Sequence, residues 1–472
     1  MSKRFSLVIG LSAFLVSHGV LANEPVTAEK VLQSILTNHP KLLELEAKNG
    51  QRLQDMAYAE AAFDIQLEQD TALRTSGYYS GDYLSQRVVN PLGAANAKFK
   101  AEYRIGNGDF PYYEREYETL SGGEVNIGFA MSLLKNRETD KKRMAIEDAK
   151  VGLAQWDAEA TLALNELVYN GLSAYLDWYE CHLNEQIYAA LVQTTKRRGN
   201  AIDTRVREGD LARITQTEFE VTVMQRELAL QAASRKAAQA REKLAYYYRD
   251  NQFQPINSAQ LNEVPDAIAW PWQAGSVNPA SLNGLIPRHP ALQSLRAEWQ
   301  LAKNKYRLAE NALLPTLDIE AKIARDIGNG PENLTGTESK VGLQFSMPLG
   351  RRQAKAEASK ASLKLREIDA VIQATEDALK RDMAVGLQAL QYGQNMLVLQ
   401  QKQAALSEAL FSQERKRFEM GDSDLFLLNS RESQAISARL DAVKAEIEIM
   451  RVVLAVYFQT GLLADPSLIT DM

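Results

Sequence analysis

Two long stretches of this sequence contain no proline, and they limit the folds that the chain can adopt. They cover residues 112–254 and 349–465, although the chain has 14 prolines in all. A proline inside a helix costs about 3 kcal/mol, so long uninterrupted helices can form here. A helix over residues 135–200 would be roughly 100 Å long at about 1.5 Å per residue, far longer than a compact globule needs.

Apolar residues in these stretches recur at alternating spacings of three and four. An average of 3.5 residues is typical of helices that pack as coiled coils, and the many alanines let such helices approach closely. We expect long helices over about 135–200, 211–249, 350–418 and 425–459. The two clearest series are Leu230, Ala233, Ala237, Ala240, Leu244 and Tyr247, and Ile436, Leu440, Val443, Ile447, Met450, Leu454 and Tyr457.

The chain also repeats itself. Short matches recur in the same order in both halves, with an offset that falls from about 250 to about 212 residues, which indicates a duplication. The falling offset places about 38 extra residues in the first half, within roughly 75–118. The matches include His39-Pro40 with His289-Pro290, Asp64-Ile65 with Asp318-Ile319, Phe129–Leu133 with Phe345–Leu349, and Gly209-Asp210 with Gly421-Asp422.

The first residues have the pattern of a secretory signal peptide. Lys3 and Arg4 precede an apolar stretch, and small residues end it at Ala22. This pattern predicts export from the cytoplasm and cleavage near Ala22. The expected organisation is therefore a signal peptide (1–22), a first repeat (23–254), a proline-rich linker (255–285), a second repeat (286–465) and a tail (466–472).

Between the helical stretches, apolar and polar residues alternate. This period of two predicts strands at about 64–74, 124–134, 316–326 and 339–349. Segments of about 9–11 residues with one apolar face suit transmembrane β-strands. A half-buried soluble hairpin is the alternative for any one segment, but the pattern occurs twice behind an export signal, which favours the membrane.

The first strand pair has a long connection, about 75–121, and the second a short one, 328–336. The long connection is rich in tyrosine, which suits a membrane–water boundary, an exposed loop or a loop that packs on itself. Its tyrosines are Tyr78, Tyr79, Tyr83, Tyr103, Tyr112, Tyr113 and Tyr117.

Four strands cannot close a barrel, and the smallest membrane barrels have about 8. An open sheet edge cannot persist in lipid because its backbone groups would lack partners. The strands must therefore be pooled from several copies of the chain. The expected fold is mainly α, with long coiled-coil helices that form an α-barrel and a small shared membrane β-barrel.

Composition excludes several other functions. The formal net charge of −6 argues against nucleic-acid binding. A single cysteine, Cys181, excludes an intrachain disulfide and a Cys-rich zinc site, and its neighbour His182 projects about 100° away on a helix. Asp422-Ser423-Asp424 lacks the glycine of a calcium loop, and Gly106-Asn107-Gly108 is a turn. We expect no enzyme activity, no cofactor and no metal.

The order of these motifs resembles the TolC-like outer-membrane efflux protein family over nearly all of the mature chain. The motifs are the paired His-Pro sequences, Leu314–Leu317 entering a strand, Phe345–Leu349 leaving one, and the turns at Gly209 and Gly421. The resemblance implies a homotrimer with a 12-stranded barrel across the outer membrane and a helical conduit in the periplasm. It further implies docking to a periplasmic adaptor protein and an inner-membrane transporter, as the passive exit duct of an efflux or type I secretion system.

The resemblance places the turns after Gly209 and Gly421 at a periplasmic tip where the channel is gated and the adaptor docks. Two positions that are usually aspartate in the family are Thr215 and Leu427 here, so the family's gate residues cannot be transferred. The candidate tip residues are Gly209, Asp210, Arg213, Gly421, Asp422, Ser423, Asp424, Phe426 and Leu427.

The tip residues allow more than one interpretation. Around a trimer, Asp422 and Asp424 would concentrate negative potential, and Phe426 or Leu427 could narrow the pore. Alternatively, Asp210 and Asp422 cap the helices that follow, which we favour. The cargo is not specified, and the alternative function is a soluble periplasmic coiled-coil scaffold or adaptor without a pore.

Overall fold

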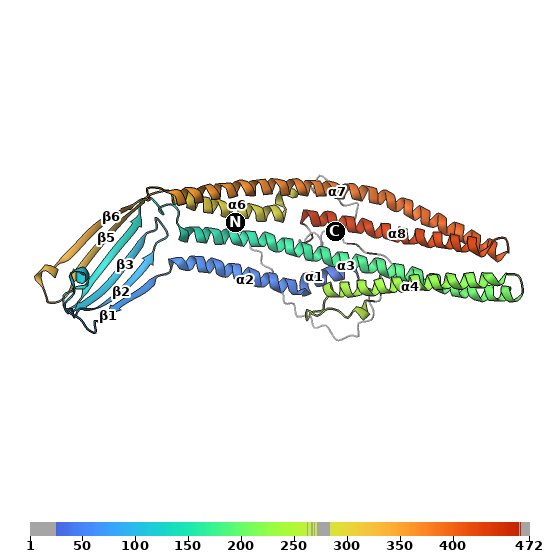
Figure 1. Ribbon diagram of the computed structural model, residues 1–472, viewed down its shortest axis with the longest axis horizontal. Coiled ribbons are helices and arrows are strands. Elements are labelled where there is room, and N and C mark those ends of the chain that lie inside the picture. The colour runs from blue at the N-terminus through green and yellow to red at the C-terminus, as the bar shows by residue number, and fades with distance from the viewer. Residues whose placement is uncertain are drawn as a thin grey trace.

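The chain forms a long rod with a curved sheet at one end and two helical hairpins at the other (Figure 1). The computed structural model describes residues 25–261, 263–265, 268, 270, 284–461 and 463. The predicted signal peptide (1–22) and tail (466–472) lie outside the described residues.

Each repeat runs from short helices through strands into a long helical hairpin. The long helices α3 and α7 have 67 and 68 residues, which corresponds to about 100 Å each, so the prediction of long helices is confirmed. The first repeat contains α1 (Ala28–Asn38), α2 (Pro40–Glu60), β1 (Gln66–Ala72), β2 (Asp82–Pro91), β3 (Lys98–Asn107), β4 (Glu124–Ser132), α3 (Lys141–Arg207) and α4 (Arg213–Tyr247). The second contains α6 (Pro290–Asn311), β5 (Thr316–Asp326), β6 (Thr337–Ser346), α7 (Arg352–Glu419) and α8 (Leu425–Thr460).

The sheet has six strands, which pair in chain order from β1 to β6, and every pairing is antiparallel. The four predicted strands are present as β1, β4, β5 and β6. The expectation of four strands per chain, joined in the first repeat by a long loop over about 75–121, is wrong because this segment contains β2 and β3. Their backbone groups complete the ladder between β1 and β4, which satisfies the hydrogen bonds that a loop would leave to solvent.

The helices lie in rows that continue from the sheet. α3 and α7 run the whole length of the helical part, whereas α2 and α6 flank its sheet-proximal half and α4 and α8 its distal half (Figure 1). Helix α3 packs against helices of both repeats, including α4, α6 and α8. The two repeats therefore form one continuous helical wall.

The main apolar core lies midway along the rod. It includes Tyr175 and Trp178 of α3, Leu244 of α4 and Leu454 of α8, all fully buried. Leu261, from the predicted linker, belongs to the same core, and its carbonyl accepts a hydrogen bond of 3.3 Å from the Trp178 indole. The described part of the linker is thus packed against the helices and is not a free tether.

The two repeats begin with the same helix cap. His39 caps α2 and His289 caps α6, and each ring accepts, through Nδ1, a hydrogen bond from the amide two residues later, at 3.1 and 3.2 Å. Proline occupies the first helical position in both cases, where its missing N–H costs nothing. This shared geometry explains why His-Pro recurs at corresponding positions of the two repeats.

Both histidines are buried in their neutral form. Burial, followed by the charges of Arg249 and Lys41, lowers the pKa of His39 to about 4, and burial lowers the pKa of His289 as well. Within the described part of the chain, Nε2 of His39 has no hydrogen-bond partner. Because Nδ1 accepts the capping hydrogen bond, the neutral ring carries its proton on Nε2, and a second proton would go to Nδ1 and break the cap.

We expect His39→Asn to reduce the loss of stability at acid pH. The folded-state pKa is about 4 against an ordinary value of 6.5, so protons bind the unfolded chain first as the pH falls. The free energy of unfolding is then unaffected by this group above pH 6.5 and falls toward pH 4, by about 2 kcal/mol at pH 5. Asparagine keeps a capping oxygen and does not titrate.

Melting temperatures from circular dichroism at pH 7.5 and pH 5.0 measure this effect. The drop between the two pH values should be smaller in the variant than in the wild type, and His289→Asn should change it in the same direction. Equal drops in wild type and both variants would contradict the assignment.

Candidate functional site

The sheet exposes its apolar face and shields its polar face. On β4, the apolar residues Val125 and Ile127 are 43% and 51% exposed, whereas the alternating Glu124 and Asn126 are 3% and 4% exposed. A soluble sheet with one buried face has the opposite arrangement. The exposed apolar side chains of the sheet include Leu67, Val88, Phe99, Tyr103, Val125, Ile127, Phe129, Ile323, Val341, Leu343 and Phe345.

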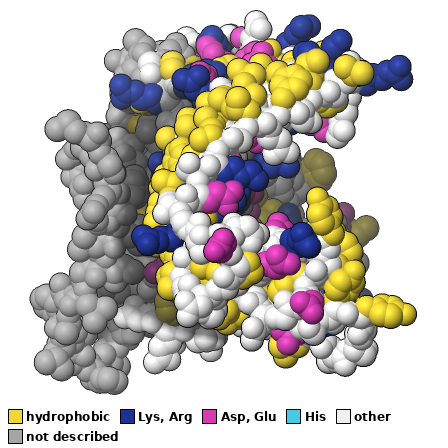
Figure 2. Space-filling model, turned by 90° about the vertical axis from the view of Figure 1, so that its left-hand side faces the viewer, with side chains coloured by type: hydrophobic (Ala, Val, Ile, Leu, Met, Phe, Trp, Pro, Cys, Tyr) yellow, Lys and Arg dark blue, Asp and Glu magenta, His cyan; other side chains and the backbone are white. Residues whose placement is uncertain are grey.

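The polar face is hollow and carries a network of charges. Glu102 accepts hydrogen bonds from Ser85 at 2.6 Å, from Arg87 at 2.9 Å and from Asn126 at 3.0 Å. Figure 2 shows hydrophobic side chains along the outer rim of the curved sheet and many charged side chains on its hollow side. A buried charge needs such partners, so this network fixes the polar side of the wall.

The same network continues toward the second repeat. The carboxylate of Glu124 on β4 binds Arg104 of β3 and, at 3.3 Å, Lys322 of β5. Lys100 of β3 and Glu320 of β5 lie 3.4 Å apart. Charged groups therefore cross-link β2 to β5 on one face, while the other face carries most of the exposed apolar side chains of the sheet. Such a sheet can separate lipid from a water-filled lumen.

The opposite end of the rod holds the two turns that the sequence analysis singled out. Gly209 and Gly421 have φ of +86° and +87°. The amide of Asp210 donates to the carbonyl five residues earlier, and so does that of Asp422. This is the Schellman ending of a helix, which favours glycine, so both glycines are explained by turn geometry.

The expectation that Asp210 and Asp422 cap the following helices is wrong. Ala212 precedes α4 without a side-chain cap, and Asp424 caps α8, accepting a hydrogen bond of 2.7 Å from the Leu427 amide. Asp210 and Asp422 directly follow the turn glycines and lie two residues before the N-cap positions, which Ala212 and Asp424 occupy.

The other candidate tip residues differ in exposure. Arg213 is exposed on the first turn of α4, and Phe426 is 82% exposed on the first turn of α8. Ser423 and Leu427 are half-buried. The structure brings the two turns to one end of the rod, where the adjoining helices share a small apolar core of Ile202, Phe219, Phe418, Leu425 and Leu428.

A buried ion triad, which the sequence analysis missed, joins the two hairpins behind this core. Glu432 of α8 accepts two hydrogen bonds from Arg198 of α3, at 2.8 and 3.0 Å, and lies 2.7 Å from Arg226 of α4. All three side chains are nearly inaccessible to solvent, and burial lowers the pKa of Arg226. The carboxylate therefore holds three helices together near the tip.

We expect Glu432→Gln to destabilise the tip by about 3–5 kcal/mol, since it leaves two buried guanidinium groups without a counter-charge. The melting temperature and the rate of proteolysis at the turns measure this effect. Glu419→Gln is the matched control, because Glu419 is exposed and lies 3.9 Å from Arg415, so the cost should stay within about 1 kcal/mol. Equal effects of the two substitutions would contradict a structural role for the triad.

A groove of about 640 Å³ runs between α4 and α8 next to the triad. Its α8 side presents Ser430, Ser433 and Ser437, and its α4 side Thr222 and Gln225. Small hydroxyl side chains at spacings of three and four leave room for another helix to approach. The groove is therefore a candidate contact surface.

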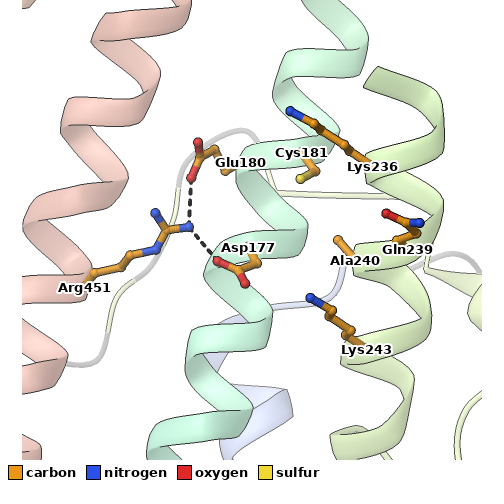
Figure 3. A pocket seen from close by; sticks show the side chains of 8 residues that line it. All are labelled: Asp177, Glu180, Cys181, Lys236, Gln239, Ala240, Lys243 and Arg451. Carbon is orange, nitrogen blue, oxygen red and sulfur yellow. Dashed lines mark hydrogen bonds and ion pairs between the residues drawn. The ribbon is translucent and has the colours of Figure 1, made fainter. Parts of the chain in front are cut away.

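A smaller polar pocket of about 200 Å³ lies nearer the middle of the rod, between α3, α4 and α8 (Figure 3). Arg451 donates to Asp177 at 2.6 Å and to Glu180 at 2.8 Å, while Lys236 lines the α4 side. Burial and the nearby carboxylates raise the pKa of the Cys181 thiol. The thiol is therefore held in its unreactive protonated form, and His182 bonds instead to Gln186 at 2.9 Å.

Across the residues that the structure describes, no helix is both long and apolar enough to cross a membrane. Among these residues, no group of three or more His, Cys, Asp or Glu side chains is arranged to hold a metal ion.

The second half of the chain matches a known protein family. Residues 282–462, the second repeat, match the family model described as outer membrane efflux protein. This match, together with the fold, supports an outer-membrane efflux channel that extends into the periplasm, and the family consists of channels and not of enzymes. The alternative of a soluble periplasmic scaffold has no support in the family or in the exposed apolar face of the sheet.

Solved structures of the same fold are distant in sequence. The outer membrane protein VceC from Vibrio cholerae is 14% identical, with 92% of this chain and 96% of that chain covered and a TM-score of 0.67. The CmeC outer membrane channel of Campylobacter jejuni is 13% identical, with 94% and 90% covered and a TM-score of 0.67. The MtrE outer membrane channel of Neisseria gonorrhoeae is 13% identical, with 92% and 88% covered and a TM-score of 0.62. No curated protein matches the sequence at significant similarity.

Proposed function

We propose that this protein is an outer-membrane efflux channel, in which three copies of the chain assemble into a passive exit duct with a shared β-barrel that continues into a helical tube. The observation that carries the proposal is the sheet with an exposed apolar face and two open edges. Among the described residues, β1 and β6 each pair on one side only. Lipid offers no partners to backbone groups, so these edges must pair with other copies.

The strand directions allow this closure. Six strands, each antiparallel to the next, leave β1 and β6 running in opposite directions. When copies are placed side by side, β6 of one meets β1 of the next in an antiparallel pair. The resemblance to TolC-like proteins supplies the number of three copies, and the charged hollow face then becomes the wall of the lumen.

We expect Leu343→Arg to abolish stable insertion into the outer membrane. Leu343 of β6 is 69% exposed on the apolar face, and an arginine facing lipid costs about 2–4 kcal/mol near the midplane in each copy. Gln344→Arg is the control, because the next residue faces the lumen. The amount of assembled oligomer in outer-membrane fractions measures both, and equal yields of the two variants would contradict the membrane assignment.

The duct needs partners at its other end, and we propose that a periplasmic adaptor docks in the groove between α4 and α8. The groove lies beside the turns, and its serines leave room for a helix. Phe426 lines it while 82% exposed, so it offers an apolar anchor. The adaptor would connect the duct to an inner-membrane transporter that selects the cargo.

We expect Ser433→Trp to block efflux without disturbing assembly. The indole would fill the groove where the adaptor helix lies, whereas Gln434→Trp, one residue along α8 and outside the groove lining, should have little effect. Drug susceptibility of a deletion strain complemented with each variant measures the effect, together with the amount of assembled oligomer. The Ser433 variant should approach the susceptibility of the deletion strain.

The deletion strain also separates the two kinds of cargo. A change in susceptibility to small molecules with an unchanged set of secreted proteins would support efflux, which the description of the family favours. Loss of a secreted protein with unchanged susceptibility would support type I secretion.

A further inference from the structure

The two repeats differ in their strands, and the difference lies in one hairpin. In the second repeat, β5 and β6 are consecutive and pair with each other. Their counterparts in the first repeat are β1 and β4, which are separated by β2 and β3. The first repeat therefore contains a complete extra hairpin between two strands that would otherwise be neighbours.

Both strands of this hairpin pair with the neighbouring strands of the sheet as well as with each other. All ten residues of β2 pair with the ten residues of β3. On one side Tyr83–Val89 pair with β1, and on the other Lys98–Arg104 pair with β4. A loop above the membrane would not form a ladder with both flanking strands.

Strand β3 of the hairpin also follows the two-sided pattern of the sheet. Phe99 of β3 lies opposite Phe129 of β4, and Tyr103 lies opposite Val125. Residues opposite each other in an antiparallel pair share a face, and these four are all exposed. The alternating residues of the hairpin point to the hollow face, where the ion pair of Arg87 with Glu102 measures 2.9 Å.

We infer that all six strands line the membrane barrel, so that a trimer forms a barrel of eighteen strands, wider than four strands per chain would give. The inference rests on the proposed trimer. With strands about 4.8 Å apart and tilted by about 40°, the backbone diameter rises from about 24 Å for twelve strands to about 36 Å for eighteen. The inserted hairpin thus enlarges the outer mouth of the duct.

The helical part supports this width. Next to the sheet, α2, α3, α6 and α7 of each chain run side by side (Figure 1). Three copies of this set, at about 9 Å between helix axes, form a ring about 34 Å across. An eighteen-stranded barrel continues this ring at nearly the same width, whereas four strands per chain would narrow it. The backbone of the barrel is therefore about as wide as the ring of helices that it continues.

Cysteine labelling of the full chain in outer-membrane vesicles tests the place of the hairpin. The background is Cys181→Ser, and single cysteines replace Phe99 or Lys100 on β3. The matched controls replace their cross-strand partners on β4, Phe129 and Gly128. A charged, water-soluble maleimide should label the cysteines at 100 and 128, which face the lumen, and should not label those at 99 and 129.

The outcomes separate this inference from the proposed channel. If both β3 positions react while the β4 positions keep their difference, the hairpin lies outside the bilayer and the inference is overturned, but the channel stands. If all four positions react, the membrane assignment itself fails.

Electron cryo-microscopy of the wild-type oligomer in lipid nanodiscs gives the strand number directly. Eighteen strands around the axis support the inference, and twelve overturn it. A variant that lacks residues 78–121 should form a barrel about a third narrower, because β1 and β4 can then pair with Leu67 opposite Ile127 on the apolar face. If this variant does not fold, the wild-type map still decides.

Discussion

The unmet hydrogen bonds of a sheet edge in lipid are the constraint on which the rest of this structure depends. Water cannot reach the backbone of β1 or β6 within a bilayer, and each unpaired group costs several kcal/mol. The chain has too little sheet to curl round on itself, so in the proposed duct its edges pair with other copies. The apolar outer face, the charged hollow face and the long helices beyond them all fit a wall that the proposed assembly completes.

The helical part is a long, thin wall, and it is stabilised without the thick apolar core of a globular domain. The uninterrupted helices α3 and α7 act as rods, and the shorter helices lie along them in two rows. Apolar residues dominate midway, around Trp178, whereas the tip combines a small apolar core with the buried triad of Glu432 and two arginines. Ion pairs stabilise less than apolar packing does, but they fix one arrangement of the helices they join.

The sequence predicted the elements whose apolar residues recur with a regular period. It did not predict the features that depend on contacts between distant residues. The spacing of apolar residues located α3, α4, α7 and α8, and strict alternation located β4 and β5. The inserted hairpin was missed because β2 places Gln86 and Asn90 on its apolar face, so it lacks a clean alternation, and its flanking tyrosines resemble those of a loop. The triad could not be found, since Arg198 and Glu432 are 234 residues apart and each has an ordinary place on a helix.

The antiparallel order of the sheet has a consequence for how such a wall can evolve. A single added strand would reverse the direction of every strand after it, and α3 would leave the sheet on the outer side of the membrane. Growth by a whole hairpin restores the original direction, so the periplasmic helices keep their side. The circumference of such a barrel can therefore change only in steps of two strands per chain. The periplasmic helices can keep their arrangement when such a step occurs.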